Sequence, residues 1–327
     1  RKIVLITGVT GFIGYHILLH PDLHWVPVRA VVRSTEQITT LLKNESIGAR
    51  YQQGLVDFAH IPDFSDVGSW KVALCGVEVL IHVAGPLPWK CLDPVRDILV
   101  ATDRMAAAIF DAARTSHFLK RIILTSSISA CTPLHGDGPF CPTTRVSIPS
   151  EPWSTVSAAY QASRINLRNN SHKFVQSNKL PFDVINILLP FVFGRNQMAE
   201  STGDLLAHFS NRMLLALLLG HRTSHPIIAQ AAHIDDVVTV HIKAMYDTIP
   251  GNQDYAVTSA IIFNDAIDIA RKHFPRAFES GALRAGDMPS GIVQWDTRKT
   301  NRVFEMGFYG FDRMVLDVVK QYLEFLE

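Results

Sequence analysis

A run of glycines near the start of the chain is the first feature that could do chemistry. It reads Thr7-Gly8-Val9-Thr10-Gly11-Phe12-Ile13-Gly14, so the glycines are spaced as GxxGxxG. Gly8 permits a tight turn, Gly11 lets a pyrophosphate approach the backbone, and Gly14 lets the next helix pack closely on a sheet. Free N–H groups at the start of that helix then face the phosphates. An apolar strand precedes the run and a helical pattern follows it, which is the context a dinucleotide site needs. The residues predicted to bind the dinucleotide here are Thr7, Gly8, Gly11, Phe12, Ile13 and Gly14.

The residues that follow the second predicted strand indicate which dinucleotide fits. An acidic residue there would bind the ribose 2′-hydroxyl of NAD and repel a 2′-phosphate. The chain instead has Arg33-Ser34 at this point. A guanidinium is a charged fork that suits a phosphate, so we predict NADP(H) as the cofactor. In the alternative interpretation, Arg33 is a solvated surface charge with Glu36 as its neighbour.

Two further positions are predicted to contact the cofactor. Asp57, expected after the third strand, could accept a hydrogen bond from the adenine amino group, or it could be a simple turn residue. Ala84 and Gly85, after the fourth strand, would pass close to the nicotinamide ribose, unless they form only a tight turn.

Strand and helix patterns alternate through the first 190 residues. The predicted strands are residues 3–6, 28–32, 50–53, 77–83, 121–125 and 182–188. The predicted helices are residues 11–19, 35–43, 93–115 and 157–176. Apolar strands separated by helices indicate an α/β fold, a Rossmann-type doubly wound parallel sheet. This rhythm breaks after Pro190, so we predict a smaller C-terminal substrate-binding lobe. The predicted domains are residues 1–189, completed by about 233–257, for NADP binding, and 190–327 mainly for substrate binding.

Composition excludes several classes of protein. Of the 327 residues, 47% are hydrophobic and 19% are charged, which predicts a packed chain. The net charge is +1 and the basic residues are scattered, so a nucleic-acid partner is not expected. The cysteines form no CxxC pair and no histidine cluster has metal-ligand spacing, which predicts no metal site and a reducing, cytoplasmic location. The longest apolar run, residues 213–219, is too short for a membrane span of about 20 residues; it is expected to fill a core.

Seven short motifs follow one another along nearly the whole chain. They are Thr7–Gly14, Arg33, His82–Gly85, Leu124–Ser127, Tyr160–Ser163, Pro190–Gly194 and His233–Val237. In this order they resemble the extended short-chain dehydrogenases/reductases of the NAD-dependent epimerase/dehydratase superfamily, nearest the dihydroflavonol-reductase and aldehyde-reductase branch. Together they specify the fold more closely than the reaction.

The resemblance implies a set of catalytic roles. Ser127, with Ser126 as the alternative, would hydrogen-bond the substrate carbonyl. Tyr160 would donate a proton to its oxygen while NADPH delivers hydride to the carbon. The segment that contains Pro190 and Val192 would hold the nicotinamide amide. The structural alternatives are that Ser127 only caps the strand end and that Tyr160 is a packed aromatic.

Position 164 departs from the family pattern, which is Tyr-x-x-x-Lys. The chain has Arg164 there, and residues i and i+4 share one helix face, so the cation can still reach the lysine's place. The family lysine binds the nicotinamide ribose, stabilises the ionised tyrosine and joins a proton relay. An arginine can do the first two, but it does not release its proton at working pH. The relay is then lost or rerouted through water.

Three functions follow from this departure. The first is an NADPH-dependent reductase of a carbonyl group with an altered relay, acting in secondary metabolism. The second is a non-redox enzyme for dehydration, cyclisation or hydrolysis, in which Tyr160, Ser127 and Arg164 serve as general acid and oxyanion ligands. The third is a non-catalytic NADP-binding protein. We predict the first, in a monomer or homodimer.

Apolar segments at the family's pocket walls predict a small hydrophobic organic substrate. They are Pro86–Trp89, Pro139–Pro142 and Phe191–Phe193. Other polar residues are expected to be structural. His82 is predicted to be a core residue and His135 a loop surface residue, and helix capping accounts for Asp235 and Asp236.

Overall fold

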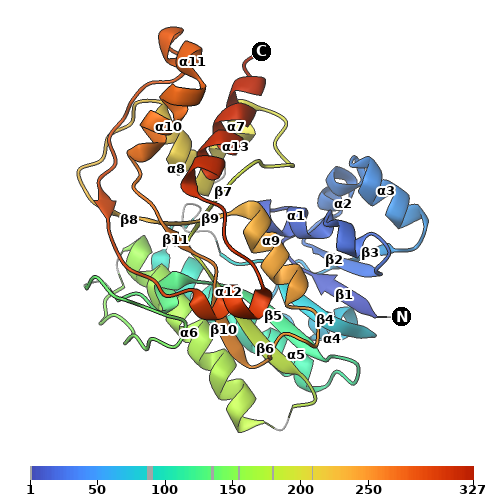
Figure 1. The fold of residues 1–327 in the computed structure, drawn as a ribbon. Coiled ribbons are helices and arrows are strands. Elements are labelled where there is room, and N and C mark those ends of the chain that lie inside the picture. Colours follow the sequence, from blue (N-terminus) through green and yellow to red (C-terminus); the bar gives the residue numbers. More distant parts are fainter. Residues whose placement is uncertain (1, 87–90, 134–135, 154, 179, 208) are drawn as a thin grey trace. The chain divides into compact units, whose positions relative to one another are not determined.

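The structure is a computed structural model that describes residues 2–86, 91–133, 136–153, 155–178, 180–207 and 209–327 (Figure 1). The backbone contacts divide the chain into two compact units. The first unit comprises Arg1–Thr132, Arg145–Leu188 and His241–Tyr255, and the second comprises Pro133–Thr144, Leu189–Val240 and Ala256–Glu327. The assignment of NADP binding to the first unit and of substrate binding to the second remains a prediction.

The first unit contains a seven-stranded sheet in the order β10-β6-β5-β4-β1-β2-β3. Its strands are β1 (Ile3–Ile6), β2 (Val28–Val32), β3 (Val56–His60), β4 (Val77–His82), β5 (Arg121–Ser127), β6 (Asp183–Leu189) and β10 (Gln253–Ala256). Strands β5, β4, β1, β2 and β3 pair in parallel, each with its neighbour. The chain crosses from β3 back to β4 on the other side of β1, which creates a topological switch point between β1 and β4. This order confirms the predicted doubly wound fold.

Parallel pairing gives the sheet two chemically distinct edges. We call the edge where the strands begin the amino edge and the edge where they end the carboxyl edge. The segments after β1, β2, β4 and β5 all leave the sheet at the carboxyl edge, and these four strands are neighbours in the sheet. Residues from four parts of the chain that are distant in sequence therefore lie next to one another along the carboxyl edge.

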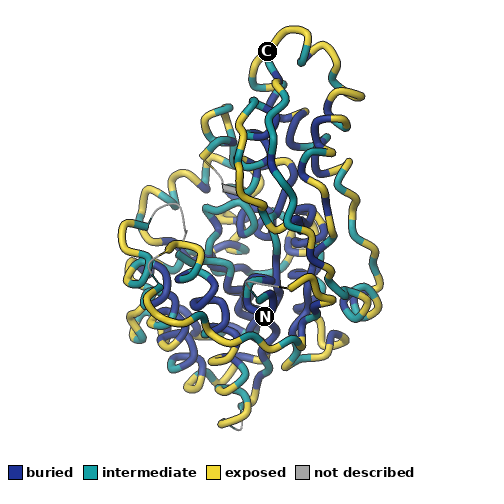
Figure 2. The backbone as a smooth tube through the Cα atoms, turned by 90° about the vertical axis from the view of Figure 1, so that its left-hand side faces the viewer, coloured by how far each residue is buried: buried dark blue, intermediate teal, exposed yellow. Residues whose placement is uncertain are grey.

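Helices cover the sheet. They are α1 (Phe12–Leu18), α2 (Thr35–Leu42), α3 (Glu45–Gln52), α4 (Val67–Ala73), α5 (Ala101–Arg114, preceded by a π-helical turn at Val95–Val100) and α6 (Val156–Ser177). Helix α9 (Ile234–Lys243) links the two units in sequence. A core of apolar side chains joins the strands to α4, α5 and α6, with Trp70, Ile109 and Leu167 facing Leu80 and Ile122. Figure 2 shows such buried segments in dark blue.

The predicted third strand at residues 50–53 is wrong, because residues 50–52 are the last of α3 and Gln53 is its C-cap. The Asn44 side chain accepts a hydrogen bond from Ile47 N at 3.2 Å and starts this helix. Arg50 is 2% exposed, and its guanidinium donates to the carbonyls of Leu18 and Leu23 at 2.8 Å each. Three distant carbonyl acceptors, counting Val26, hold this cation in the interior, and no local pattern reveals them. The actual strand, β3, begins after Gly54.

The second unit is built on two small sheets. One has the order β11-β9-β7 and the other pairs β12 with β8. These strands are β7 (Phe191–Phe193), β8 (Ile227–Ile228), β9 (Gln230–His233), β11 (Ser259–Ala260) and β12 (Ser290–Gly291). The helices are α7 (Thr202–Ala207), α8 (Phe209–Leu218), α10 (Asp265–His273), α11 (Pro275–Glu279), α12 (Arg298–Phe304) and α13 (Phe311–Glu324). The apolar run of residues 213–219 fills the core of this unit, as expected, with Leu214, Leu215, Leu217 and Leu218 fully buried.

Candidate active site

The glycine turn lies at the carboxyl edge between β1 and α1, and two of its glycines are sterically required. Gly8 has a φ of +69°, and a Cβ there would lie 3.0 Å from the backbone nitrogen of Ala84. A Cβ on Gly14 would collide with the Gly8 carbonyl oxygen. Gly11 N donates to the same oxygen at 2.9 Å and closes the turn. The backbone of the turn therefore packs directly against the start of α1. The three glycines form a surface without side chains there, which we call the cradle.

Thr7 ties the end of β1 to the end of β4. Its hydroxyl accepts hydrogen bonds from Val83 N and Ala84 N, both at 3.0 Å. With both lone pairs used, the hydroxyl donates its proton to His82 Nδ1 at 3.0 Å. The imidazole then carries its own proton on Nε2 and is neutral; burial, with the nearby Arg164 charge, lowers the pKa of His82 to about 3. His82 is the buried core residue that was predicted, and its bond to Thr7 positions the turn.

Arg33 follows β2 at the same edge, and its backbone is fixed while its side chain is exposed. Arg33 N donates to Gln37 Oε1 at 2.7 Å, and Gln37 Nε2 donates to Thr10 Oγ1 in the glycine turn at 3.2 Å. No carboxylate of the described residues lies within 4 Å of its guanidinium. Glu36 instead interacts with Ser34, whose side-chain hydrogen bond lowers the pKa of that carboxyl. The ion pair with Glu36 that would make Arg33 a simple surface charge is therefore not formed.

Asp57 does not follow a strand, contrary to expectation. It is the second residue of β3, beside Arg29 of β2, and its carboxylate binds that guanidinium through two bonds of 3.0 and 2.9 Å. This places it near the amino edge, away from the glycine turn, so the reason for assigning it to adenine does not hold. The first acidic residue after β3 is Asp63. Its carboxylate accepts from the backbone N and the hydroxyl of Ser65, both at 2.8 Å, and these bonds lower its pKa. Because the third strand was predicted at residues 50–53, Asp57 and not Asp63 was expected to be the first acidic residue after it.

Ser127 ends β5 at the carboxyl edge and is 6% exposed. Its hydroxyl accepts from Ser129 N at 3.2 Å and donates to the Ser129 hydroxyl at 3.1 Å. The capping contact that was an alternative to catalysis is thus present, and it fixes the Ser127 oxygen at the strand end. Ser126 points to the opposite face, and its hydroxyl is buried without a hydrogen-bond partner in the described part of the chain.

Tyr160 and Arg164 lie one turn apart on α6. The Arg164 guanidinium carbon is 4.9 Å from the centre of the Tyr160 ring. Arg164 is 6% exposed; its Nε donates to Ser163 Oγ at 3.2 Å and its Nη2 to Thr102 Oγ1 at 3.1 Å. Its terminal nitrogens lie 3.7 and 3.9 Å from the place of a Cβ on Gly85. Residues from α5, α6 and the segment after β4 are therefore brought together at the carboxyl edge.

The segment after β5 also contacts α6. Gln161, next to Tyr160, donates through Nε2 to the Thr132 carbonyl at 2.7 Å, and α6 packs on β5 and on the short helical turn Ile128–Ala130. This packing holds the helix that carries Tyr160 beside the strand that carries Ser127. The structure thus brings together the elements of all three residues predicted to be catalytic.

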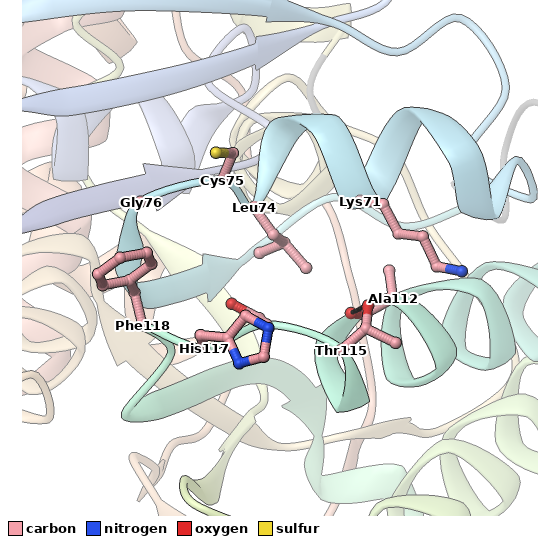
Figure 3. Close-up of a pocket in the computed structure, with 9 residues that line it drawn as sticks. Lys71, Leu74, Cys75, Gly76, Ala112, Thr115, His117 and Phe118 are labelled. Atoms are coloured by element: carbon pink, nitrogen blue, oxygen red, sulfur yellow. Dashed lines mark hydrogen bonds between the residues drawn. The ribbon is translucent and has the colours of Figure 1, made fainter.

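Two cavities of the first unit lie away from the predicted catalytic residues. A cavity of about 160 Å³ is lined by the ends of α4 and α5, with Leu74, Cys75 and His117 around it (Figure 3). Gly76 and Phe118, which also line it, precede β4 and β5, so this cavity is at the amino edge. A second cavity of about 700 Å³ lies between β3 and α4. None of the predicted catalytic residues lines either cavity.

The remaining predicted residues lie in the second unit or outside the described residues. Val192 is in β7 beside Ala232 of β9, and Pro190 precedes that strand, so their role at the nicotinamide stays a prediction. Phe193 is fully buried in the core of the second unit, and Phe140 packs on Trp295. Phe193 is thus not free to line a substrate pocket, contrary to expectation. Residues 87–89 and His135 lie outside the described residues.

Asp235 and Asp236 lie within the first turn of α9 rather than before it. The Asp236 carboxylate accepts from Tyr309 N at 2.8 Å, and burial raises its pKa to about 6. Within the described residues, no group of three or more His, Cys, Asp or Glu side chains could hold a metal ion, and no helix is long and apolar enough to cross a membrane.

Comparisons with known proteins follow the same outline. A model of the family described as NAD dependent epimerase/dehydratase matches residues 4–257. The chain is 29% identical to "Ketoreductase CTB6" of Cercospora nicotianae, over all of this chain and 96% of that protein. It is 30% identical to "NAD-dependent epimerase/dehydratase ALT6" of Alternaria alternata, over 75% of this chain and 73% of the relative.

Two solved structures share the fold. The complex of Gre2 with NADPH from Candida albicans superposes with a TM-score of 0.84, with 18% identity and full coverage of both chains. Vestitone reductase from alfalfa superposes with a TM-score of 0.72, with 20% identity and 99% coverage of both chains.

Proposed function

The chain belongs to the NAD dependent epimerase/dehydratase family, and from this premise we propose that it is an NADPH-dependent reductase of a carbonyl group on a small hydrophobic molecule. One observation carries the proposal. A buried guanidinium, that of Arg164, lies over the Tyr160 ring at the carboxyl edge of the sheet. Curated relatives that span the whole chain and are named ketoreductases support the reaction class.

The carboxyl edge offers a complete set of groups for NADP(H). The cradle of Gly8, Gly11 and Gly14 would take the pyrophosphate, since a Cβ at either outer glycine would collide with backbone atoms and displace the turn. The unpaired Arg33, with Ser34, would take the 2′-phosphate. Ala84 and Gly85 would line the nicotinamide end. Asp63 takes the place of Asp57 at the adenine, because it is the first acidic residue after β3.

When bound, NADPH supplies the hydride that reduces the carbonyl carbon. The protein's own residues handle the oxygen. Ser127 turns its hydroxyl proton from the Ser129 hydroxyl to the carbonyl oxygen. Tyr160 transfers its phenolic proton to that oxygen as the alcohol forms. The phenolate left behind is stabilised by Arg164, because a cation on the ring face favours the electron-rich ion. Arg164 keeps its proton throughout, so Tyr160 regains a proton from water.

The proposal is tested by incubating the protein with NADPH and a panel of hydrophobic ketones and aldehydes. NADPH oxidation is followed at 340 nm and products are identified by mass spectrometry. We expect one alcohol formed for each NADPH oxidised. A product formed without NADPH consumption would instead assign non-redox chemistry to the same residues. Tight NADPH binding without turnover of any compound would indicate a binding protein.

A further inference from the structure

Arg164 is held along one edge of its guanidinium by two hydroxyl groups, those of Thr102 and Ser163, which we call the hydroxyl pair. Nε and Nη2 donate to them at 3.2 and 3.1 Å. These two nitrogens share one side of the planar group, so the two contacts fix the rotation of the whole plane. Both hydroxyl-bearing residues are 0% exposed, so solvent does not compete for the guanidinium at this side.

The Ser163 hydroxyl can act only as an acceptor toward Arg164. Its own proton is donated to the Tyr160 carbonyl oxygen at 2.7 Å. The oxygen lone pairs therefore remain for the Arg164 Nε–H. Tyr160 and Arg164 are thus coupled twice, through Ser163 and through the ring contact at 4.9 Å.

The opposite end of the guanidinium is left without a protein acceptor. Nη1 has no hydrogen-bond partner among the described residues, and both terminal nitrogens face Gly85, which has no side chain. The neighbouring carboxylate, Asp103, accepts from Asn166 at 3.1 Å and lies more than 4 Å from the Arg164 nitrogens. Nη1 is not among the fully buried polar atoms that lack a partner, so this end of the guanidinium is open to solvent. A ligand with two adjacent oxygens can replace water there and bind both terminal nitrogens.

We propose that Thr102 and Ser163 are positioning residues that fit this site to arginine and aim its two terminal nitrogens at a vicinal diol. The inference rests on the proposed function, in which that diol is the nicotinamide ribose of NADP(H). A lysine carries all its donors on one nitrogen, so it cannot contact the hydroxyl pair along one edge and offer a parallel fork to a ligand. Arg164 is therefore the residue the site is built for, and lysine is a poorer one.

The test measures the Kd of NADPH by fluorescence titration for the wild type, Thr102→Val, Thr102→Ser, Ser163→Ala, Arg164→Lys and the double variant Thr102→Val/Arg164→Lys. Loss of a hydrogen bond to a charged group weakens binding about tenfold. We expect about this loss for Thr102→Val and at least this loss for Arg164→Lys, with Thr102→Ser close to the wild type. In the Arg164→Lys background, Thr102→Val should raise the Kd of NADPH by less than about twofold. The Thr102 hydroxyl has then already lost the guanidinium donor to which it binds in the wild type.

Thr115→Val is the matched control, since Thr115 lies at the end of the same helix and its hydroxyl donates to the Ala112 carbonyl at 2.9 Å, away from Arg164. Melting curves show whether each variant folds. If Thr102→Val does not fold, Thr102→Ala and Ser163→Ala replace it in the comparison with Arg164→Lys. The inference is overturned if Arg164→Lys binds NADPH as well as the wild type or better, or if the effects of Thr102→Val and Arg164→Lys multiply. If the wild type itself binds no nicotinamide nucleotide, the proposed function fails together with the inference; multiplying effects overturn the inference alone.

Discussion

At the amino edge of the central sheet three basic side chains each meet a carboxylate, whereas at the carboxyl edge two arginines meet none. The amino-edge pairs have separations between 2.7 and 3.1 Å; they are Arg29–Asp57, Lys120–Glu78 and Arg121–Asp183. At the carboxyl edge, Arg33 and Arg164 have no carboxylate within 4 Å in the described residues. Paired charges neutralise each other within the fold, while an unpaired cation keeps its binding capacity for a ligand. This difference separates the structural edge from the candidate active site.

The comparison is tested most strongly at Tyr160. Tyr160→Phe removes the proposed proton donor and keeps the ring beside Arg164. Loss of a general acid costs roughly 10²- to 10⁴-fold in rate, so kcat should fall by about this factor while the Kd of NADPH stays within about twofold. Steady-state kinetics and NADPH titration measure the two quantities. Equal kcat for the variant and the wild type would remove Tyr160 from the chemistry.

The next test removes a pair at the amino edge. Asp183→Asn leaves Arg121, which is 7% exposed on its side chain, without its carboxylate. Breaking a buried pair in this way costs about 3 kcal/mol, part of which the two carbonyls that Arg121 also contacts will offset. Urea unfolding should show this loss, with an unchanged Kd of NADPH. A weakened cofactor affinity with unchanged stability would contradict the division between the edges.

A third test uses pH, because the carboxyl edge depends on a neutral His82. Its folded pKa, about 3, is below that of an unfolded histidine, so the unfolded chain binds more protons between these values. Stability is therefore fully present above the unfolded pKa and is lost as pH falls, by up to about 1.4 kcal/mol per pH unit. Unfolding free energies measured from pH 7 to pH 5 should show this slope, and His82→Asn should flatten it. An unchanged slope in the variant would assign the pH dependence to other groups.

The smallest expected effect is at Arg33. Arg33→Ala should weaken NADPH binding about tenfold, through loss of charge-assisted hydrogen bonds, and leave NADH binding unchanged. Asp57→Asn is the control from the amino edge. It breaks a partly exposed pair, so it should cost less than about 1 kcal/mol of stability and leave NADPH affinity unaltered. Equal losses for NADPH and NADH in Arg33→Ala would show that Arg33 does not read the 2′-phosphate.

The sequence alone determined the features that depend on local pattern. Alternating apolar strands and helices predicted the doubly wound sheet, and strands β1, β2, β4, β5 and β6 were located to within two residues. The glycine spacing predicted the turn because a strand-to-helix turn of this tightness needs residues without a Cβ, and the Gly8–Gly14 contact lies within the local segment. The sequence also determined that Arg164 lies beside Tyr160, since residues four apart share one face of a helix.

Only the tertiary structure decided the rest. Residues 50–52 are helical rather than extended, because the Arg50 guanidinium donates hydrogen bonds to carbonyl groups 24 to 32 residues earlier in the chain. The tertiary structure moved Asp57 to the amino edge, where Arg29 neutralises it. It also brought Thr102, 62 positions before Arg164, against that guanidinium. Such contacts join residues that are remote in sequence, so their energies depend on how the elements pack and leave no trace in any local pattern.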